Sequence, residues 1–168
     1  VAVDPVLPVP GPAAFQVPGA VACDGVAGAA GKTIQEVRDL KHEGKCQGVM
    51  IEGSVKCALE YHAKHGLSGI IGVGGSMGTA LGTVVMGMFP YGLPKVMVST
   101  MASGFTKPFI GAKDINMFNP VCDIAGLNSI TRDVFRNAAL RPYIQWEGFE
   151  NVARLYEDKL EVTTFTAA

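Results

Sequence analysis

The chain has 168 residues, 48% of them hydrophobic and only 17% charged, with a net charge of −1. This length suits one domain with a sizeable core, and the near-neutral charge gives no signal for binding nucleic acid or an anionic membrane. The four cysteines form no C-x-x-C pair, which excludes a disulfide scaffold and a zinc ribbon and points to reduced thiols in a cytoplasmic protein. Because the sequence starts without Met inside an apolar run, we expect residues upstream of it.

The first part of the chain predicts a strand end, a proline-rich loop and then helices. Residues 1–4 look like the end of a strand, and five prolines between positions 5 and 18 interrupt regular structure. Asp24 is a candidate cap for a short helix, and "TIQEVRDLKHE" continues with helical character.

The next segment, "CQGVMIEGSVKCALEYHAKHG", has two interpretations. Residues 49–51 could form a strand, but Ile51, Val55 and Leu59 share one helical face with His62. A helix that ends at Gly66 is favoured. His62 and His65 lie in its last turn, where a structural role suits both.

The centre of the chain predicts a complete βαβ unit. Gly66 to Pro94 carries no charge, but its many glycines and hydroxyls favour a buried strand, turn and helix over a transmembrane span. "SGIIGV" is a continuously apolar strand, residues 76–89 form a helix, and "KVMVST" is the next strand, parallel to the first.

Further elements follow the βαβ unit and complete the fold class. "DINMF" is a candidate third strand, and Asn128 or Ser129 caps the helix "ITRDVFRNAA". An amphipathic helix at 143–159 and a strand "LEVTTF" follow. We therefore expect an α/β, Rossmann-like open sheet, mostly parallel, with helices on both faces.

The glycine turn after the first predicted buried strand, "GGSMG" at 74–78, has three chemical interpretations. It spells the G-x-S-x-G elbow of a serine nucleophile, but all three histidines precede Ser76, so the usual triad order cannot form. A dinucleotide fingerprint would need glycine where Met77 stands. A phosphate cradle at a helix N-terminus is the interpretation that remains, beside the alternative that the glycines only allow tight packing.

A second polar loop, "STMASG", follows the next strand. In parallel sheets, ligands bind at the carboxyl edge of the strands, so both loops should converge there on a phosphorylated or nucleotide ligand. Asp114 or Asp123 could hold Mg²⁺ or act as a base, although loop hydrogen bonding would explain each singly. Lys107 and Lys113 could neutralise phosphate but also suit a solvated surface.

Four ordered segments resemble one family. "GIIGVGGSMGTALG", "GLPKVMVSTMASG", "IGAKDINMF" and "VCDIAGLNSITRDVFRNAA" are similar to the Tm-one-like ATP-binding domain family, over about residues 69–139. The resemblance implies the N-terminal, nucleotide-binding domain of a two-domain α/β protein. Its motifs carry nucleotide-binding roles onto the following residues: Gly74, Gly75, Ser76, Gly78, Thr79, Ser99, Thr100, Ser103, Gly104, Asp114 and Asn128.

The chain departs from the family pattern in ways that shape the predicted domains. The family's first strand with its D-T-K motif is missing, T-S-D-I is replaced by "AKDI", and GGSGGT by "GGSMGT". We expect residues 1–160 to be an N-terminal nucleotide-binding domain without its first strand and helix, and 161–168 to start a second domain or linker.

Three functions stay open at this stage. The first is binding of ATP or a phosphometabolite, with Mg²⁺ held by Asp114 and Asp123, in a homo-oligomer. The second is a magnesium-dependent hydrolase or ligase-type enzyme, for which no catalytic residue is assigned. The third is a module for a protein partner in which the nucleotide is structural.

Overall fold

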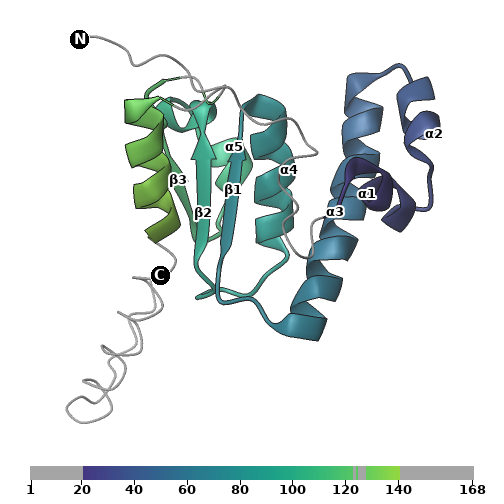
Figure 1. The fold of residues 1–168 in the computed structure, drawn as a ribbon, viewed down its shortest axis with the longest axis horizontal. Helices are drawn as coiled ribbons and strands as arrows, with labels where there is room; N and C mark the ends of the chain where they lie inside the picture. Colours follow the sequence, from purple (N-terminus) through teal and green to yellow (C-terminus); the bar gives the residue numbers. More distant parts are fainter. Residues whose placement is uncertain (1–20, 123, 125–127, 141–168) are drawn as a thin grey trace.

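A computed structural model describes residues 21–122, 124 and 128–140 (Figure 1). It is an α/β structure built on a three-stranded parallel sheet with helices on both faces. The strands are β1 (Ile70–Gly74), β2 (Lys95–Ser99) and β3 (Ile115–Phe118). The predicted fold class is confirmed. The strand and helix predictions for residues 1–20 and 141–168 lie outside the described residues.

The helices before the sheet are α1 (Cys23–Ala29), α2 (Ile34–Asp39) and α3 (Glu43–His65). Thr33 and Glu36 form a reciprocal capping box that starts α2. The predicted long helix is confirmed, with Gly66 as its C-cap at φ 71°. The predicted Asp24 cap is wrong, because α1 begins at Cys23 and its N-cap, Ala22, has no side-chain acceptor.

The predicted βαβ unit is confirmed. β1 and β2 are parallel neighbours, paired so that Gly74 lies opposite Ser99, and α4 (Ser76–Gly87) connects them. Two short helices, η1 (Thr100–Ser103) and α5 (Lys107–Ile110), lead to β3, which pairs with β2 on its other side. The chain reaches the carboxyl edge of the sheet after each strand.

Two apolar clusters fix the layers of the fold. On one face, Met97 of β2 packs with Met86 of α4 and Ile115 of β3. On the other face, Val96 and Val98 pack against the helix at 129–140, through Ala138, Val134 and Phe135. Figure 1 shows these helices on opposite sides of the sheet.

β1 is an edge strand of the described sheet and is only half covered. Ile71 and Val73 face the same side as their register partners Val96 and Val98, yet they are 48% and 53% exposed. The continuous apolar run of residues in β1 predicted a strand that is buried on both faces. The structure corrects this prediction, because one face of β1 is half exposed. None of the helices within the described ranges is long and apolar enough to cross a membrane.

Candidate functional site

The carboxyl edge of the sheet brings three loops together. The turn at Gly74–Ser76 follows β1, η1 follows β2, and Asn119–Cys122 follows β3. Parallel pairing places these strand ends side by side. The two glycine- and hydroxyl-rich loops predicted from the sequence therefore do converge.

The N-terminus of α4 is uncapped and opens onto this edge. Its N-cap is Gly75, which supplies no side-chain acceptor. The helix itself offers no partner to the N–H groups of Ser76, Met77 and Gly78, and no hydrogen bond to them occurs among the described residues. These donors and the positive end of the helix dipole together favour an anion.

Two adjacent glycines have different roles. A Cβ on Gly74 would lie 2.7 Å from the Gly78 Cα, so this glycine allows β1 and α4 to pack closely. A Cβ on Gly75 would meet only the Thr100 Oγ1, at 3.8 Å. Gly74 therefore serves packing, whereas Gly75 borders an open space between the turn and η1.

A buried hydrogen-bond relay joins the two loops. The Thr79 hydroxyl donates to the Gly75 carbonyl at 2.7 Å, and the Met101 N–H donates to Ser99 Oγ at 2.9 Å. Because the Thr79 proton is used in this way, the Ser99 hydroxyl must be the donor in the hydrogen bond between the two side chains. Thr79 and Ser99, both predicted as ligands, are fully buried and hold the loops in place.

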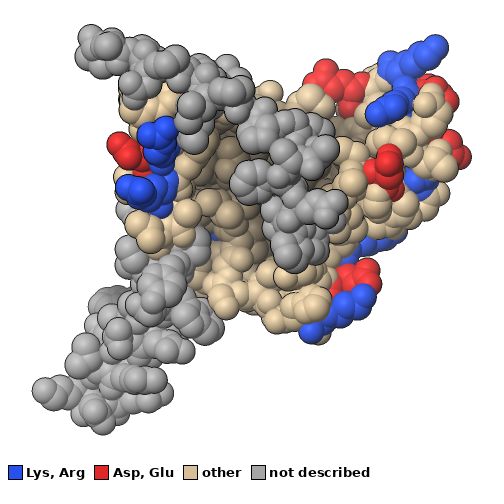
Figure 2. Space-filling view, in the orientation of Figure 1, with Lys and Arg blue, Asp and Glu red and all other residues tan. Residues whose placement is uncertain are grey.

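A cleft of about 490 Å³ lies beside the turn, between the loops after β2 and β3. Its described lining is mostly polar and carries no charge; it is formed by Thr100, Ser103, Asn119, Val121 and Cys122. Thr100 is also the residue that a Cβ on Gly75 would meet, so the cleft adjoins the uncapped helix end. Figure 2 shows the charged side chains gathered toward the two flanks of the visible face, with an uncharged surface between them where described residues can be seen.

The loop after β3 holds a strained backbone. Val121 has φ 67°, in the left-handed region that a β-branched residue rarely occupies. The Cys122 N–H donates to the Pro120 carbonyl at 2.7 Å, and Asn119 Oδ1 accepts from the Val121 N–H at 3.1 Å. These bonds hold a tight γ-turn against the cleft. Such strain, of about 1–3 kcal/mol, is concentrated at functional sites in proteins.

Asp114 does not belong to this edge. It precedes β3 and therefore lies at the amino edge of the sheet, where its carboxylate contacts Lys95 Nζ at 2.8 Å and accepts from the Gly92 N–H at 2.8 Å. Burial raises the pKa of Asp114, but the hydrogen bonds from Lys95 and Gly92 outweigh it and leave the pKa below its ordinary value. The structure thus separates Asp114 from the glycine turn with which it was predicted to act.

The remaining predicted ligands fall in three groups. Asn128 caps the helix at 129–140, since its Oδ1 accepts from the Thr131 N–H at 2.9 Å, as the sequence predicted. Ser76, Ser103 and Gly104 are exposed at the edge. Asp123 lies outside the described residues, so its metal role stays a prediction. No cluster of three or more His, Cys, Asp or Glu side chains suited to a metal occurs in the described ranges.

The three histidines all belong to the α3 region. His42 caps α3 through Nδ1, His62 accepts from the Leu67 N–H, and His65 contacts the Tyr61 ring. Each therefore has a structural contact of its own, and none lines the cleft at the carboxyl edge.

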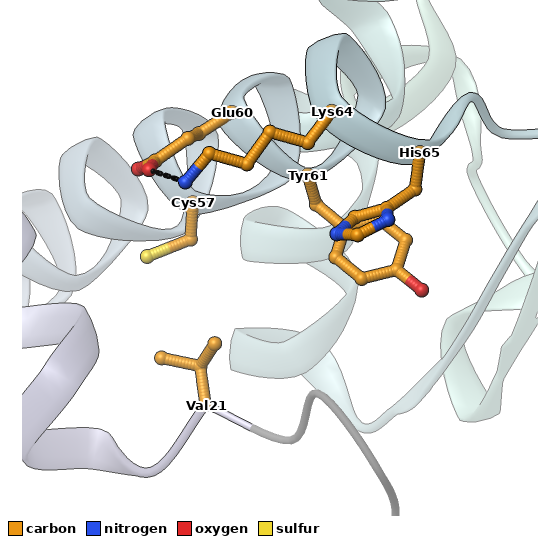
Figure 3. Close-up of a pocket in the computed structure, with 6 residues that line it drawn as sticks. All are labelled: Val21, Cys57, Glu60, Tyr61, Lys64 and His65. Atoms are coloured by element: carbon orange, nitrogen blue, oxygen red, sulfur yellow. Dashed lines mark hydrogen bonds and ion pairs between the residues drawn. The ribbon is translucent and has the colours of Figure 1, made fainter.

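A second, shallow pocket of about 220 Å³ lies on α3, away from the strand ends. Figure 3 shows the side chains that line it: Val21, Cys57, Glu60, Tyr61, Lys64 and His65. Glu60 and Lys64 pair with each other at 2.6 Å. The charged groups of this pocket are thus satisfied locally, which makes the sheet edge the stronger candidate site.

Sequence reasoning missed three residues at the edge. Asn119 and Cys122 line the cleft, and Gln47 reaches from α3 to donate to the Met77 carbonyl at 3.1 Å. Asn119 could have been predicted, because it directly follows the predicted strand "DINMF" and ligands bind at the carboxyl ends of parallel strands. Nothing in the local sequence marks Gln47, which is thirty positions from its partner.

Comparison with known proteins matches the sequence to a family. Residues 10–142 match the N-terminal domain of the uncharacterised protein family UPF0261. A UPF0261 protein of Clostridium tetani is 41% identical over 109 residues, which cover 65% of this chain and 27% of that protein. A second, from Mesorhizobium japonicum, is 47% identical over 103 residues, covering 61% of this chain and 26% of the relative.

The resemblance inferred from the four motifs is also confirmed. The tomato (Solanum lycopersicum) protein named ToMV resistance protein Tm-1(GCR237) is 46% identical over 72 residues, covering 43% of this chain and 10% of that protein. The chain spans about a quarter of the length of the bacterial relatives it matches. Since the family match extends over most of its length, the chain belongs to the UPF0261 family, whose N-terminal domain it resembles.

Proposed function

We propose that the carboxyl edge of the sheet binds the phosphate of a nucleotide such as ATP, or of another phosphorylated metabolite. The observation that carries this proposal is the uncapped α4 N-terminus, which adjoins a polar cleft: a Cβ on Gly75 would lie 3.8 Å from the hydroxyl of Thr100, a residue that lines the cleft. The N–H groups of Ser76, Met77 and Gly78 would receive the phosphate oxygens. The cleft would receive the neutral part of the ligand.

The side chains that line the cleft support binding of a ligand rather than catalysis. A nucleophilic serine needs a general base within hydrogen-bond reach. Among the described residues, neither a histidine nor a carboxylate lines the cleft. Ser76 and Thr100 would therefore act as hydrogen-bond donors to the ligand. The enzyme and protein-interaction alternatives remain predictions for the longer protein.

The test is a thermal unfolding series with ATP and Mg²⁺, ADP and inorganic phosphate. A ligand at about 100 times its dissociation constant stabilises the native state by about 2.7 kcal/mol. Gly75→Val should abolish this shift, because its side chain fills the open space toward Thr100. The Cβ itself meets no atom closer than 3.8 Å, so the variant should still fold, although the less favourable N-cap should lower its unfolding temperature without ligand by a small amount.

The matched control is Gly87→Val at the other end of α4, where a Cβ would meet Lys113 at 3.9 Å. This variant should keep the ligand-induced shift of the unsubstituted chain. The proposal is wrong if no phosphorylated ligand stabilises the unsubstituted chain, or if Gly75→Val responds as strongly as Gly87→Val.

A further inference from the structure

Val121 places an apolar side chain in the lining of the cleft at the carboxyl edge. The residue is 73% exposed, and its backbone has φ 67°, which glycine would adopt without strain. Because so little of the valine is buried, packing in the core does not offset this strain. Its side chain is therefore open to a ligand, at a position where glycine would serve the fold better.

Asn119 presents hydrogen-bond donors to the same cleft. Its Oδ1 accepts from the Val121 N–H at 3.1 Å, which assigns the two ends of the amide. The Nδ2 group therefore carries two donors, and it has no hydrogen-bond partner among the described residues. The hydroxyl of Thr100, which also lines the cleft, makes no hydrogen bond within the same ranges. The cleft thus combines one apolar surface with neutral donors.

This combination suits a nucleobase better than a sugar. A base has a flat face for apolar contact, and the ring nitrogens and carbonyl oxygens at its edge accept hydrogen bonds. A sugar presents hydroxyls, each of which donates as well as accepts and needs an acceptor when it is bound. The Asn119 Oδ1 already accepts from Val121, and no carboxylate occurs in the described lining.

The position of the cleft agrees with the length of a nucleotide. The turn at Gly75 follows β1, whereas the cleft lies between the loops after β2 and β3. Neighbouring strands are about 5 Å apart, so the cleft is displaced from the turn by one to two strand spacings. In a nucleotide the ribose separates the phosphate from the base over a similar span. A phosphate at the α4 N-terminus would therefore bring the base to Val121, and the sugar of a sugar phosphate would stop short of it.

We propose that the cleft binds the base of a nucleotide, with Val121 against the face of the base and Asn119 Nδ2 donating to its edge. This inference rests on the phosphate site proposed above, and it specifies the group attached to the phosphate. Val121 and Asn119 are then the residues that select nucleotides over sugar phosphates and inorganic phosphates.

The test is calorimetric titration of the 168-residue chain with ATP and Mg²⁺, and separately with inorganic tripolyphosphate. The unsubstituted chain should bind ATP about tenfold more tightly than tripolyphosphate. Val121→Gly should weaken ATP binding about tenfold, because the apolar contact is lost, and should leave the affinity for tripolyphosphate unchanged. Its unfolding temperature without ligand should stay close to that of the unsubstituted chain, because relief of the strained φ offsets the added entropy of the unfolded state.

A second variant tests the donor, and a third controls for the backbone. In Asn119→Ser the serine oxygen can still accept from the N–H two residues on, but the amide donors are lost. ATP should then bind about fivefold less tightly, and tripolyphosphate as before. Lys41→Gly is the matched control, because Lys41 also has a positive φ, of 45°, and lies between α2 and α3. It should keep the affinity for ATP.

The outcomes separate this inference from the phosphate site on which it rests. If tripolyphosphate binds as tightly as ATP, or if Val121→Gly binds ATP like the unsubstituted chain, the base assignment is wrong and the phosphate site stands. Equal weakening of both ligands in Val121→Gly, or an equal loss of ATP affinity in Lys41→Gly, would also overturn the base contact. If neither ATP nor tripolyphosphate binds the unsubstituted chain, the phosphate site is wrong and the base assignment with it.

Discussion

Lys95 is a fully buried lysine whose charge is matched by its surroundings. Its ammonium donates to the carbonyls of Pro90 and Leu93, at 2.7 and 3.0 Å, and to Asp114 at 2.8 Å. Three acceptors use all three donors of the group. A buried charge is tolerated when it is paired and fully hydrogen-bonded in this way. Lys95 thus fastens the loop before β2 to the start of β3.

Replacing Lys95 by Met should destabilise the domain by about 3 kcal/mol, because two backbone carbonyls lose their donor and Asp114 loses its counter-ion. Urea unfolding measures this loss. Lys113→Met is the control: Lys113 is exposed and lies 5.0 Å from the Tyr91 ring centre, so its loss should cost no more than about 1 kcal/mol. Equal costs for the two variants would show that the buried hydrogen bonds of Lys95 contribute little.

The lowered pKa of Asp114 predicts a pH dependence of stability with a definite sign. A carboxyl whose pKa is lower in the folded state stabilises the fold above its unfolded pKa, and this stabilisation is lost as the pH falls through the folded pKa. Asp114→Asn should therefore be less stable than the unsubstituted chain at neutral pH. The difference in the free energy of unfolding should shrink in strong acid. A difference that is constant across this range would contradict the assignment.

At the scale of the elements, the packing of α4 on β1 depends on one glycine. Gly74→Ala would place a Cβ 2.7 Å from the Gly78 Cα and 2.9 Å from its carbonyl carbon, and backbone cannot give way as a side chain can. We expect a loss of roughly 1–3 kcal/mol. Gly75→Ala, one position later, should unfold within about 1 kcal/mol of the unsubstituted chain. Thermal unfolding of the two variants decides whether the contact is as close as the structure shows.

Elements with a strong periodic pattern were predictable from the sequence. The helix expected at 76–89 is α4, Ser76–Gly87, and the strand expected at 95–100 is β2, Lys95–Ser99. Asp24 misled because an acidic residue near the start of a helix resembles a cap, although here it lies inside the first turn. The coverage of β1 could not be read from its residues, since burial depends on which elements pack beside it.

Across the whole molecule, the edge of the sheet at which each candidate residue lies was predictable from its order relative to the strands, because the residues after parallel strands share the carboxyl edge. Ser99 ends β2 and Thr100 begins η1, so both lie at the carboxyl edge as predicted, whereas Asp114 precedes β3 and the same rule assigns it to the opposite edge. The buried relay between Thr79 and Ser99 needed the register of two strands, which no local pattern specifies. Topology thus decides which hydroxyls can face a ligand and which are committed to the fold.

The described lining of the cleft carries no charge, and this has a consequence for how a ligand would arrive. Lysine and arginine attract anions across several ångströms of solvent, and salt screens that attraction. The attraction of amide and hydroxyl dipoles falls off over a shorter distance than that of a full charge. A phosphate held by the amides of Ser76, Met77 and Gly78 would therefore be found by random encounter rather than by long-range steering. The association rate would stay nearly constant as ionic strength rises, and discrimination would rest on how well the bound ligand fits.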